Sequence, residues 1–322
     1  MKARVRHLSG LGHLPTWIWP LSAAVALWLI GCALSGRVSA ELLLTNVTLS
    51  TFLGLAALGQ MTVVARGAGS FDLSVPYTVT FSAFISATVM DANNTGIAEG
   101  IVVGLLAGVV IGLLNGILVV GPGMPPIVAT LASGYIAYSA ILGLQTARAD
   151  PAPGLSSLLR AERGGLALVV PIACFAWLVV AILVRRTQFG LDLHAMGQSQ
   201  RAAYLAGVRI RSISVAAFAL SGLLGGLAGV LLAGYDGGVF TDMANTYLIG
   251  SMAAVVVGGT SVEGGVTGVL ATVFGALVMT MLVTVLVISH ASIGVQDVAE
   301  GAIIVLVVGL SRVAHQGAYK LN

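Results

Sequence analysis

Charge is scarce in this chain, and lysine is almost absent. Only 8% of the 322 residues are charged, whereas an ordinary soluble domain has about 25% charged residues. Lysine occurs only at positions 2 and 320. The phosphate-binding loop G-x-x-x-x-G-K-[ST] requires a lysine within the motif, and neither position provides one. The chain therefore cannot supply a nucleotide-hydrolysing site of this type.

Signatures of catalysis and metal binding are also missing. The five histidines form no H-E-x-x-H pair, and the sequence contains no G-x-S-x-G, which excludes two familiar hydrolase motifs. Cys32 and Cys174 both lie inside apolar runs, so they predict packing rather than a disulfide framework or a cysteine-rich metal site. We expect no catalytic residues, no metal and no cofactor, and a membrane-embedded enzyme would need a convergent polar cluster that the sequence lacks.

Apolar residues dominate what remains. Hydrophobic residues make up 57% of the chain, and glycine occurs 42 times. A helix needs about 20 apolar residues to cross a bilayer, and glycine suits helices that pack closely in lipid. We predict an all-α fold, a single polytopic membrane helix bundle over residues 1–322 with about ten spans. Interruptions in the apolar runs place these spans near residues 16–35, 42–65, 72–90, 97–120, 126–146, 165–184, 213–234, 246–258, 264–289 and 296–312.

The basic residues predict the orientation of the bundle. The opening "MKARVRH" and the apolar run after it resemble a secretory signal, but the run from Trp17 to Leu34 is long enough for a retained first span. With the N-terminus inside, eleven of the 15 basic residues fall on the cytoplasmic side and four outside. The outside residues are Arg37, Arg148, Arg160 and Arg163. The positive-inside rule therefore favours two cytoplasmic termini, and it explains the sequence pI of about 9.1 without nucleic acid.

One long polar loop interrupts the apolar pattern. It runs over residues 185–212 as "RRTQFGLDLHAMGQSQRAAYLAGVRIRS". Ser199 is well placed to cap a short helix, "QRAAYLA", which Gly207 could end in a left-handed turn. The loop is either a solvated connection whose arginines fix the topology or a docking element for a cytoplasmic partner.

A weak internal repeat appears at an offset of 191 residues. The segment 58–75 aligns with 249–266, and Asp72 then meets Glu263, each just after a Gly/Ser break. A duplication would give parallel repeats around 45–120 and 240–312, because both copies run in the same direction across the predicted membrane.

Four segments carry a resemblance to a known family. They are "GSFDLSV" (69–75), "RRTQFGLDLHAMGQSQRAAYLAGV" (185–208), "ALSGLLGGLAGVL" (219–231) and "AAVVVGGTSVEGGVTGVLATVFGAL" (253–277). They resemble the inner-membrane permease subunits of ribose-type ABC importers, and the likeness runs from about residue 45 to 312. This resemblance implies a bacterial inner-membrane permease for a monosaccharide or similar small polyol. It also implies a cytoplasmic ATPase, a second permease copy or homologue, and an extracytoplasmic solute-binding protein.

The resemblance also assigns a role to the polar loop. In the family, the matching segment looks like the cytoplasmic coupling helix that sits in a groove of the ATPase. The residues concerned here are Gly197, Gln198, Ser199, Gln200, Arg201, Ala202, Ala203, Leu205 and Gly207. This chain departs from the family at Gln198, Ser199 and Gln200, where acidic residues or asparagine are common, and at Phe71 and Pro76 in the first motif.

Two further sets of residues are candidates for gating and for the solute pathway. Asp72 and Glu263 could cap the following helices, act at gate hinges or touch the solute. The hinge candidates are Gly67, Gly69, Asp72, Ser74, Gly258, Gly259, Glu263 and Gly264. Polar residues in or beside spans are candidates for the pathway, because amide groups suit a neutral polyol, although each could equally make an interhelical hydrogen bond. They are Asn46, Gln60, Asn115, Asn245 and Tyr247.

Two alternative functions stay open at this point. A permease for branched-chain amino acids is the nearest alternative among importers. A secondary transporter or channel needs no ATPase but often carries ionisable residues in the middle of its spans, and Glu99 and Glu300 lie close to the predicted span ends.

Overall fold

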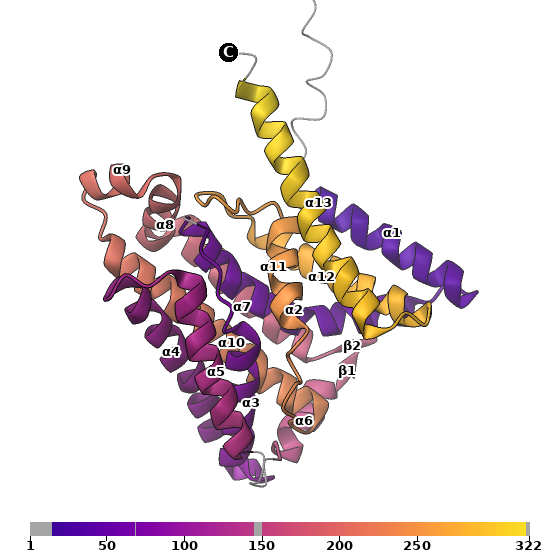
Figure 1. Cartoon of the computed structure of the whole chain (residues 1–322). Coiled ribbons are helices and arrows are strands. Elements are labelled where there is room, and N and C mark those ends of the chain that lie inside the picture. The colour runs from indigo at the N-terminus through magenta and orange to yellow at the C-terminus, as the bar shows by residue number, and fades with distance from the viewer. Residues whose placement is uncertain (1–14, 68, 145–149, 320–322) are drawn as a thin grey trace, which may run out of the picture.

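The chain folds into a bundle of long helices. The computed structural model describes residues 15–67, 69–144 and 150–319 (Figure 1). A helix occupies each of the ten predicted positions, which confirms the all-α fold. These helices are α1 (Ile18–Ser35), α2 (Ala40–Ala65), α3 (Val75–Met90), α4 (Ile97–Val120), α5 (Pro126–Leu144), α7 (Val169–Arg186), α10 (Ile210–Asp236), α11 (Tyr247–Val257), α12 (Val269–Ile288) and α13 (Ile293–Tyr319). The basic residues Lys2, Arg4, Arg6, Arg148 and Lys320 lie outside the described residues.

Seven helices of the described part are long and apolar enough to cross a membrane: α1, α2, α4, α5, α7, α10 and α12. The helices α3 and α11 are shorter, with 16 and 11 residues. At about 1.5 Å per residue they extend over only ~24 and ~16 Å, less than the hydrocarbon core of about 30 Å. The predicted span 72–90 begins instead at Val75 and the predicted span 264–289 at Val269, because irregular backbone precedes both helices.

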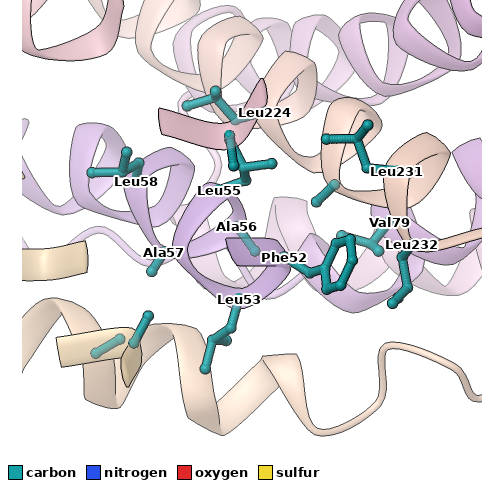
Figure 2. Packing of buried hydrophobic residues seen from close by; sticks show 14 of the residues in the cluster. Phe52, Leu53, Leu55, Ala56, Ala57, Leu58, Val79, Leu224, Leu231 and Leu232 are labelled. Atoms are coloured by element: carbon teal, nitrogen blue, oxygen red, sulfur yellow. The ribbon is translucent and has the colours of Figure 1, made fainter. Parts of the chain in front are cut away.

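The helix α2 forms the centre of the bundle. Every residue from Ser50 to Ala65 is buried. Figure 2 shows Phe52, Leu55 and Leu58 of α2 among Leu224, Leu231 and Leu232 of α10 and Val79 of α3. A helix that is apolar on all sides is stable in a protein core or in lipid, but the buried Thr51, Gln60 and Thr62 of α2 would be costly against lipid. These polar side chains therefore favour the central position of α2.

Glycines bring α4 and α10 into direct backbone contact. Gly104, Gly108, Gly112 and Gly116 are spaced four residues apart, so they share one face of α4. A Cβ atom at Gly108 would lie 2.2 Å from the carbonyl oxygen of Gly222. Small residues at this spacing let membrane helices approach closely, which is the use of glycine that the composition predicts.

The polar connections fold into smaller elements. The loop 185–212 contains α8 (Gln188–Gln198) before α9 (Gln200–Leu205), and only the second helix was expected from the sequence. On another connection, α6 (Pro153–Arg160) precedes a hairpin of β1 (Glu162–Arg163) and β2 (Leu166–Ala167), and a 3-10 turn, Asn94–Gly96, leads into α4. Figure 1 shows α8, α9 and the last turns of α13 at one end of the molecule, with α6 toward the other.

Candidate functional site

The helix α9 has the start and the end that the sequence predicts. The backbone of Ser199 is extended, and its hydroxyl oxygen accepts a hydrogen bond from the Ala202 N–H at 3.2 Å. Gly207 has a φ of 86°, a left-handed conformation that favours glycine. Local interactions therefore define this short helix.

One face of α9 is anchored and the other is exposed. Ala203 packs into a small buried cluster with Ala65, Leu193, Met196 and Ala217. Tyr204 and Leu205 are 70% and 77% exposed. Beside them lies an open groove of about 970 Å³, whose lining includes Arg201, Arg209 and Arg211. The helix thus offers an apolar pair and a basic groove to an external partner.

Four glycines meet where the end of α8 contacts two breaks in the bundle, the irregular segments before α3 and before α12. A Cβ atom at Gly197 would lie 2.1 Å from the carbonyl oxygen of Ala65 and 2.2 Å from the nitrogen of Gly265. A Cβ atom at Gly264 would lie 2.4 Å from the Cα of Gly67. In addition, the Gly265 N–H donates to the Ala65 carbonyl at 3.0 Å. We call the meeting point of Gly197, Gly67, Gly264 and Gly265 the glycine junction.

The glycine junction unites residues that the sequence placed in two separate sets. Gly197 is a candidate for coupling, whereas Gly67 and Gly264 are candidates for gate hinges. Both hinge glycines have left-handed backbone, with φ of 85° and 97°. The conformations and the close contacts together explain why no residue with a side chain fits at either position.

The other hinge candidates lie around this junction. Gly69 and Gly259 also have positive φ, and a Cβ atom at either would meet open space. Gly258 lies against the backbone of Thr272 in α12. Glu263 is exposed, and α12 begins only at Val269 with Gly268 as its N-cap. The expectation that Glu263 caps this helix is therefore wrong, because the intervening turn separates the carboxylate from the helix start.

Asp72 lies inside the bundle, in the break between α2 and α3, and is only 3% exposed. One carboxylate oxygen accepts hydrogen bonds from the Ser74 N–H at 3.0 Å and the Ser74 hydroxyl at 2.5 Å. The other accepts from the Ser221 hydroxyl of α10 at 2.8 Å. The Asp72 N–H donates to the Gln60 amide oxygen at 3.2 Å. Asp72 thus binds the backbone just before α3 and ties it to α10.

The same network extends to α4 and α5. The Asn115 amide donates to the Ser74 hydroxyl at 2.8 Å, and the Ser133 hydroxyl donates to Asn115. The Thr130 hydroxyl accepts from the Leu73 N–H at 3.0 Å. We call this set the Asp72 network; its side chains are Gln60, Asp72, Ser74, Asn115, Thr130, Ser133 and Ser221. Five helices or helix starts therefore meet at one buried polar point.

The five pathway candidates do not gather in one place. Gln60 and Asn115 are fully buried in the Asp72 network. Asn46 lies 14 residues before Gln60 on α2, about 21 Å along the helix axis, and accepts from the Thr284 hydroxyl of α12 at 2.7 Å. Asn245 is exposed in the loop before α11. Tyr247 begins α11 and packs against the apolar core.

The sequence alone did not identify some residues of this region as candidates. Thr130, Ser133 and Ser221 are ordinary hydroxyl residues in apolar segments, and only their long-range contacts mark them. Arg66 counted only as an orientation marker, yet it is 8% exposed and lies over the Phe218 ring at 5.6 Å. Its Nε and Nη1 atoms find no hydrogen-bond partner in the described part of the chain.

Comparisons with known proteins give the same picture as the sequence motifs. The family model described as "Branched-chain amino acid transport system / permease component" matches residues 42–308. The ribose import permease protein RbsC of Bacillus subtilis (strain 168) is 32% identical over 268 residues, which are 80% of this chain and 81% of that protein. The L-arabinose ABC transporter permease protein AraH of Azospirillum brasilense is 31% identical over 274 residues, 83% of this chain and 77% of its own length.

A further relative matches over a shorter region. The probable ABC transporter permease protein YphD of Escherichia coli (strain K12) is 35% identical over 191 residues, so the match spans 58% of this chain and 56% of YphD. No solved structure matches the chain. Because the family model covers most of the chain and RbsC is similar over four fifths of both proteins, the chain belongs to this family of ABC transporter permeases.

Proposed function

We propose that this chain is the membrane-spanning subunit of an ATP-driven importer for a monosaccharide or a similar small polyol. The relatives named for ribose, arabinose and xylose support a sugar. The family model carries the name of branched-chain amino acid transport, but the named relatives favour a sugar over an amino acid. We place the chain in the bacterial inner membrane with α8 and α9 on the cytoplasmic side.

The glycine junction is the observation that carries this proposal. A permease without its own ATPase needs one element that receives work from outside and passes it to the spans. The helix α9 exposes Tyr204 and Leu205, and Gly197 in the last turn of the preceding α8 lies against Ala65 and Gly265. Since these contacts join backbone to backbone, no flexible side chain absorbs a displacement. A displacement of α9 is therefore transmitted to both breaks, the one before α3 and the one before α12.

The two breaks are the proposed gate. Gly67 and Gly69 precede the Asp72 network, and Gly258, Gly259 and Gly264 precede α12. When ATP binding closes the ATPase dimer, movement of α9 shifts both breaks and turns the passage to face the other side of the membrane. The permease does no covalent chemistry. It binds the solute weakly, because tight binding in the resting state would slow release of the solute. A ligand shifts the balance between the two conformations only through its different affinities for them.

The proposed partners follow from this mechanism. A cytoplasmic ATPase receives the 199–207 segment, a second copy of the permease or a homologue completes the passage, and an extracytoplasmic binding protein supplies affinity for the solute. The aligned segments 58–75 and 249–266 both pass from a helix through a glycine break toward another helix. The parallel duplication stays a prediction.

Reconstitution in proteoliposomes tests the function. The permease is assembled with its ATPase and its binding protein, and ATP hydrolysis and uptake of ¹⁴C-labelled D-ribose, D-xylose and L-arabinose are measured. We expect binding protein loaded with one of these sugars to stimulate hydrolysis and uptake, whereas leucine does not compete. A complex with a P-loop lysine variant of the ATPase is the control. Equal uptake by the permease alone would instead indicate a secondary transporter.

A further inference from the structure

Three tyrosines form an aromatic cluster between α3 and α5. The ring centroids of Tyr77 and Tyr135 lie 5.8 Å apart, and those of Tyr77 and Tyr138 lie 5.6 Å apart in an edge-on arrangement. Gly134 makes room for this contact, because a Cβ atom there would lie 2.6 Å from the Tyr77 ring. Tyr135 is 58% exposed, and Tyr77 and Tyr138 are partly exposed.

The tyrosines of α5 lie near the middle of that helix rather than at its ends. Tyr135 and Tyr138 are the tenth and thirteenth of the 19 residues of α5, so Tyr135 is about 13 Å from either helix end. Tyrosines that anchor a protein in a membrane sit at the two interfaces with water. The depth of Tyr135 therefore excludes this ordinary explanation for an exposed tyrosine in a span.

An exposed carboxylate lies near the same cluster. Asp242 is exposed in the segment between α10 and the short α11, within electrostatic range of the Tyr77 hydroxyl. Asn245 and Thr246, three and four residues further on, are also exposed. Exposed polar groups beside a span would be costly against lipid, so the face is suited to water or a polar solute.

We propose that Tyr77, Tyr135, Tyr138 and Asp242 form the site that holds the sugar during its passage through the membrane. A sugar ring has an apolar C–H face, which fits an aromatic ring, and a rim of hydroxyls. Tyrosine supplies a rigid apolar ring with a polar tip, and a carboxylate accepts hydrogen bonds from hydroxyls. Small-molecule sites commonly combine aromatic walls with a few polar groups.

A second copy of this chain fits the face less well than a sugar. Contact between two copies would bury the Asp242 carboxylate, and a buried charge is strongly unfavourable unless it is paired. A sugar instead supplies hydroxyl donors to this carboxylate and to the tyrosine hydroxyls. Tyr135 is also exposed, so a sugar ring can stack on its aromatic ring. The site rests on the proposed function, because it concerns the solute of that importer.

Substitutions at Tyr135 test the site in the complete reconstituted importer. Tyr135→Leu removes the aromatic face, and we expect uptake of the transported ¹⁴C-labelled pentose to fall at least tenfold. Tyr135→Phe keeps the face and should retain uptake within about threefold. Asp242→Asn should lower uptake severalfold. Phe175→Leu is the matched control, since Phe175 is 69% exposed on α7. Phe175→Leu should leave uptake and basal ATP hydrolysis unchanged, and co-purification of the ATPase with each of the four variants shows that the variant is folded.

Three results would overturn the site. Uptake by Tyr135→Leu equal to that of Phe175→Leu would show that the solute does not use the ring. If Tyr135→Leu changed the number of permease copies per complex, measured by cross-linking, the face would instead be a contact between copies. A wild-type complex without sugar uptake and without stimulated hydrolysis would contradict the proposed function itself, and the sugar site with it. The last result differs from the others because the unmodified protein fails.

Discussion

Gly197 at the end of α8 lies against the carbonyl oxygen of Ala65 at the end of α2, so closely that a Cβ atom at Gly197 would be 2.1 Å away. Real Cβ atoms do not approach an oxygen this closely, and the backbone of Ala65 is fixed in the buried α2. The contact therefore requires glycine and brings the polar loop 185–212 into direct contact with the central helix α2. Substitution at Gly197 is the most direct test of transmission through the glycine junction.

We expect Gly197→Ala to reduce sugar-stimulated ATP hydrolysis at least tenfold, because the added methyl group separates α8 from Ala65 and Gly265. Basal hydrolysis and membrane insertion should persist. Hydrolysis with and without loaded binding protein measures the difference. Gly301→Ala is the matched control, since a Cβ atom there meets open space. Normal stimulation in Gly197→Ala would show that the junction does not transmit the movement.

Asp72→Ala should destabilise the bundle. The substitution leaves the Ser74 N–H and the hydroxyls of Ser74 and Ser221 without their acceptor. A buried donor that loses its partner costs about 1–3 kcal/mol, so we expect a loss of several kcal/mol and a lower Tm of the detergent-solubilised protein. Asp297→Ala, at an exposed acid of α13, is the control. Equal melting temperatures for the two variants would contradict a structural role for Asp72.

Gly108→Leu should separate α4 from α10. A leucine side chain cannot fit where a single Cβ atom already lies 2.2 Å from the carbonyl oxygen of Gly222. Overpacking a closely packed contact typically costs about 1–3 kcal/mol or more. Thermal unfolding should show the loss, while Val102→Leu, at a position 54% exposed on the same helix, should leave Tm unchanged. A stable Gly108→Leu protein would mean that the glycines of α4 are not required for contact.

Ser199→Ala should weaken binding of the ATPase without affecting the spans. Loss of an N-cap costs a helix about 0.5–2 kcal/mol, and a loss of ~1 kcal/mol in preorganisation corresponds to about a fivefold higher Kd. Ser199→Asp keeps an oxygen acceptor for the Ala202 N–H and should restore binding. The Kd of the solubilised permease for its ATPase measures both effects. Identical Kd values for Ser199→Ala and the unmodified chain would contradict docking through α9.

The positions of the helices could be predicted from the sequence because they depend on composition. Any stretch of about 20 apolar residues must satisfy its backbone polar groups internally in lipid, and a helix does so. The ends of α9 were predictable for a similar reason, since Ser199 and Gly207 act on backbone within a few residues. The extra helix α8 was missed, because it mixes polar and apolar residues within a polar loop, and the burial of its Leu193 and Met196 depends on distant parts of the chain.

The roles of the polar residues inside the bundle could not be predicted in this way. Gln60 and Asn115 have the chemistry of a solute pathway, yet they bind the turn at Asp72 and Ser74. Nothing local distinguishes these two uses, because Asn115 and Ser74 lie 41 residues apart in the chain and meet only through packing. The expected cap at Glu263 was wrong for a related reason: helix α12 starts only at Val269.

The sequence by itself therefore determined that this protein is a bundle of membrane helices with one short capped helix in its longest polar segment. Hydrophobicity and local hydrogen bonding decide these features, and both act over short stretches of chain. Only the tertiary structure decided which glycines touch, which polar groups share a network and which tyrosines remain open. Those relationships depend on contacts between segments far apart in the chain, and packing selects them only when the whole bundle has formed.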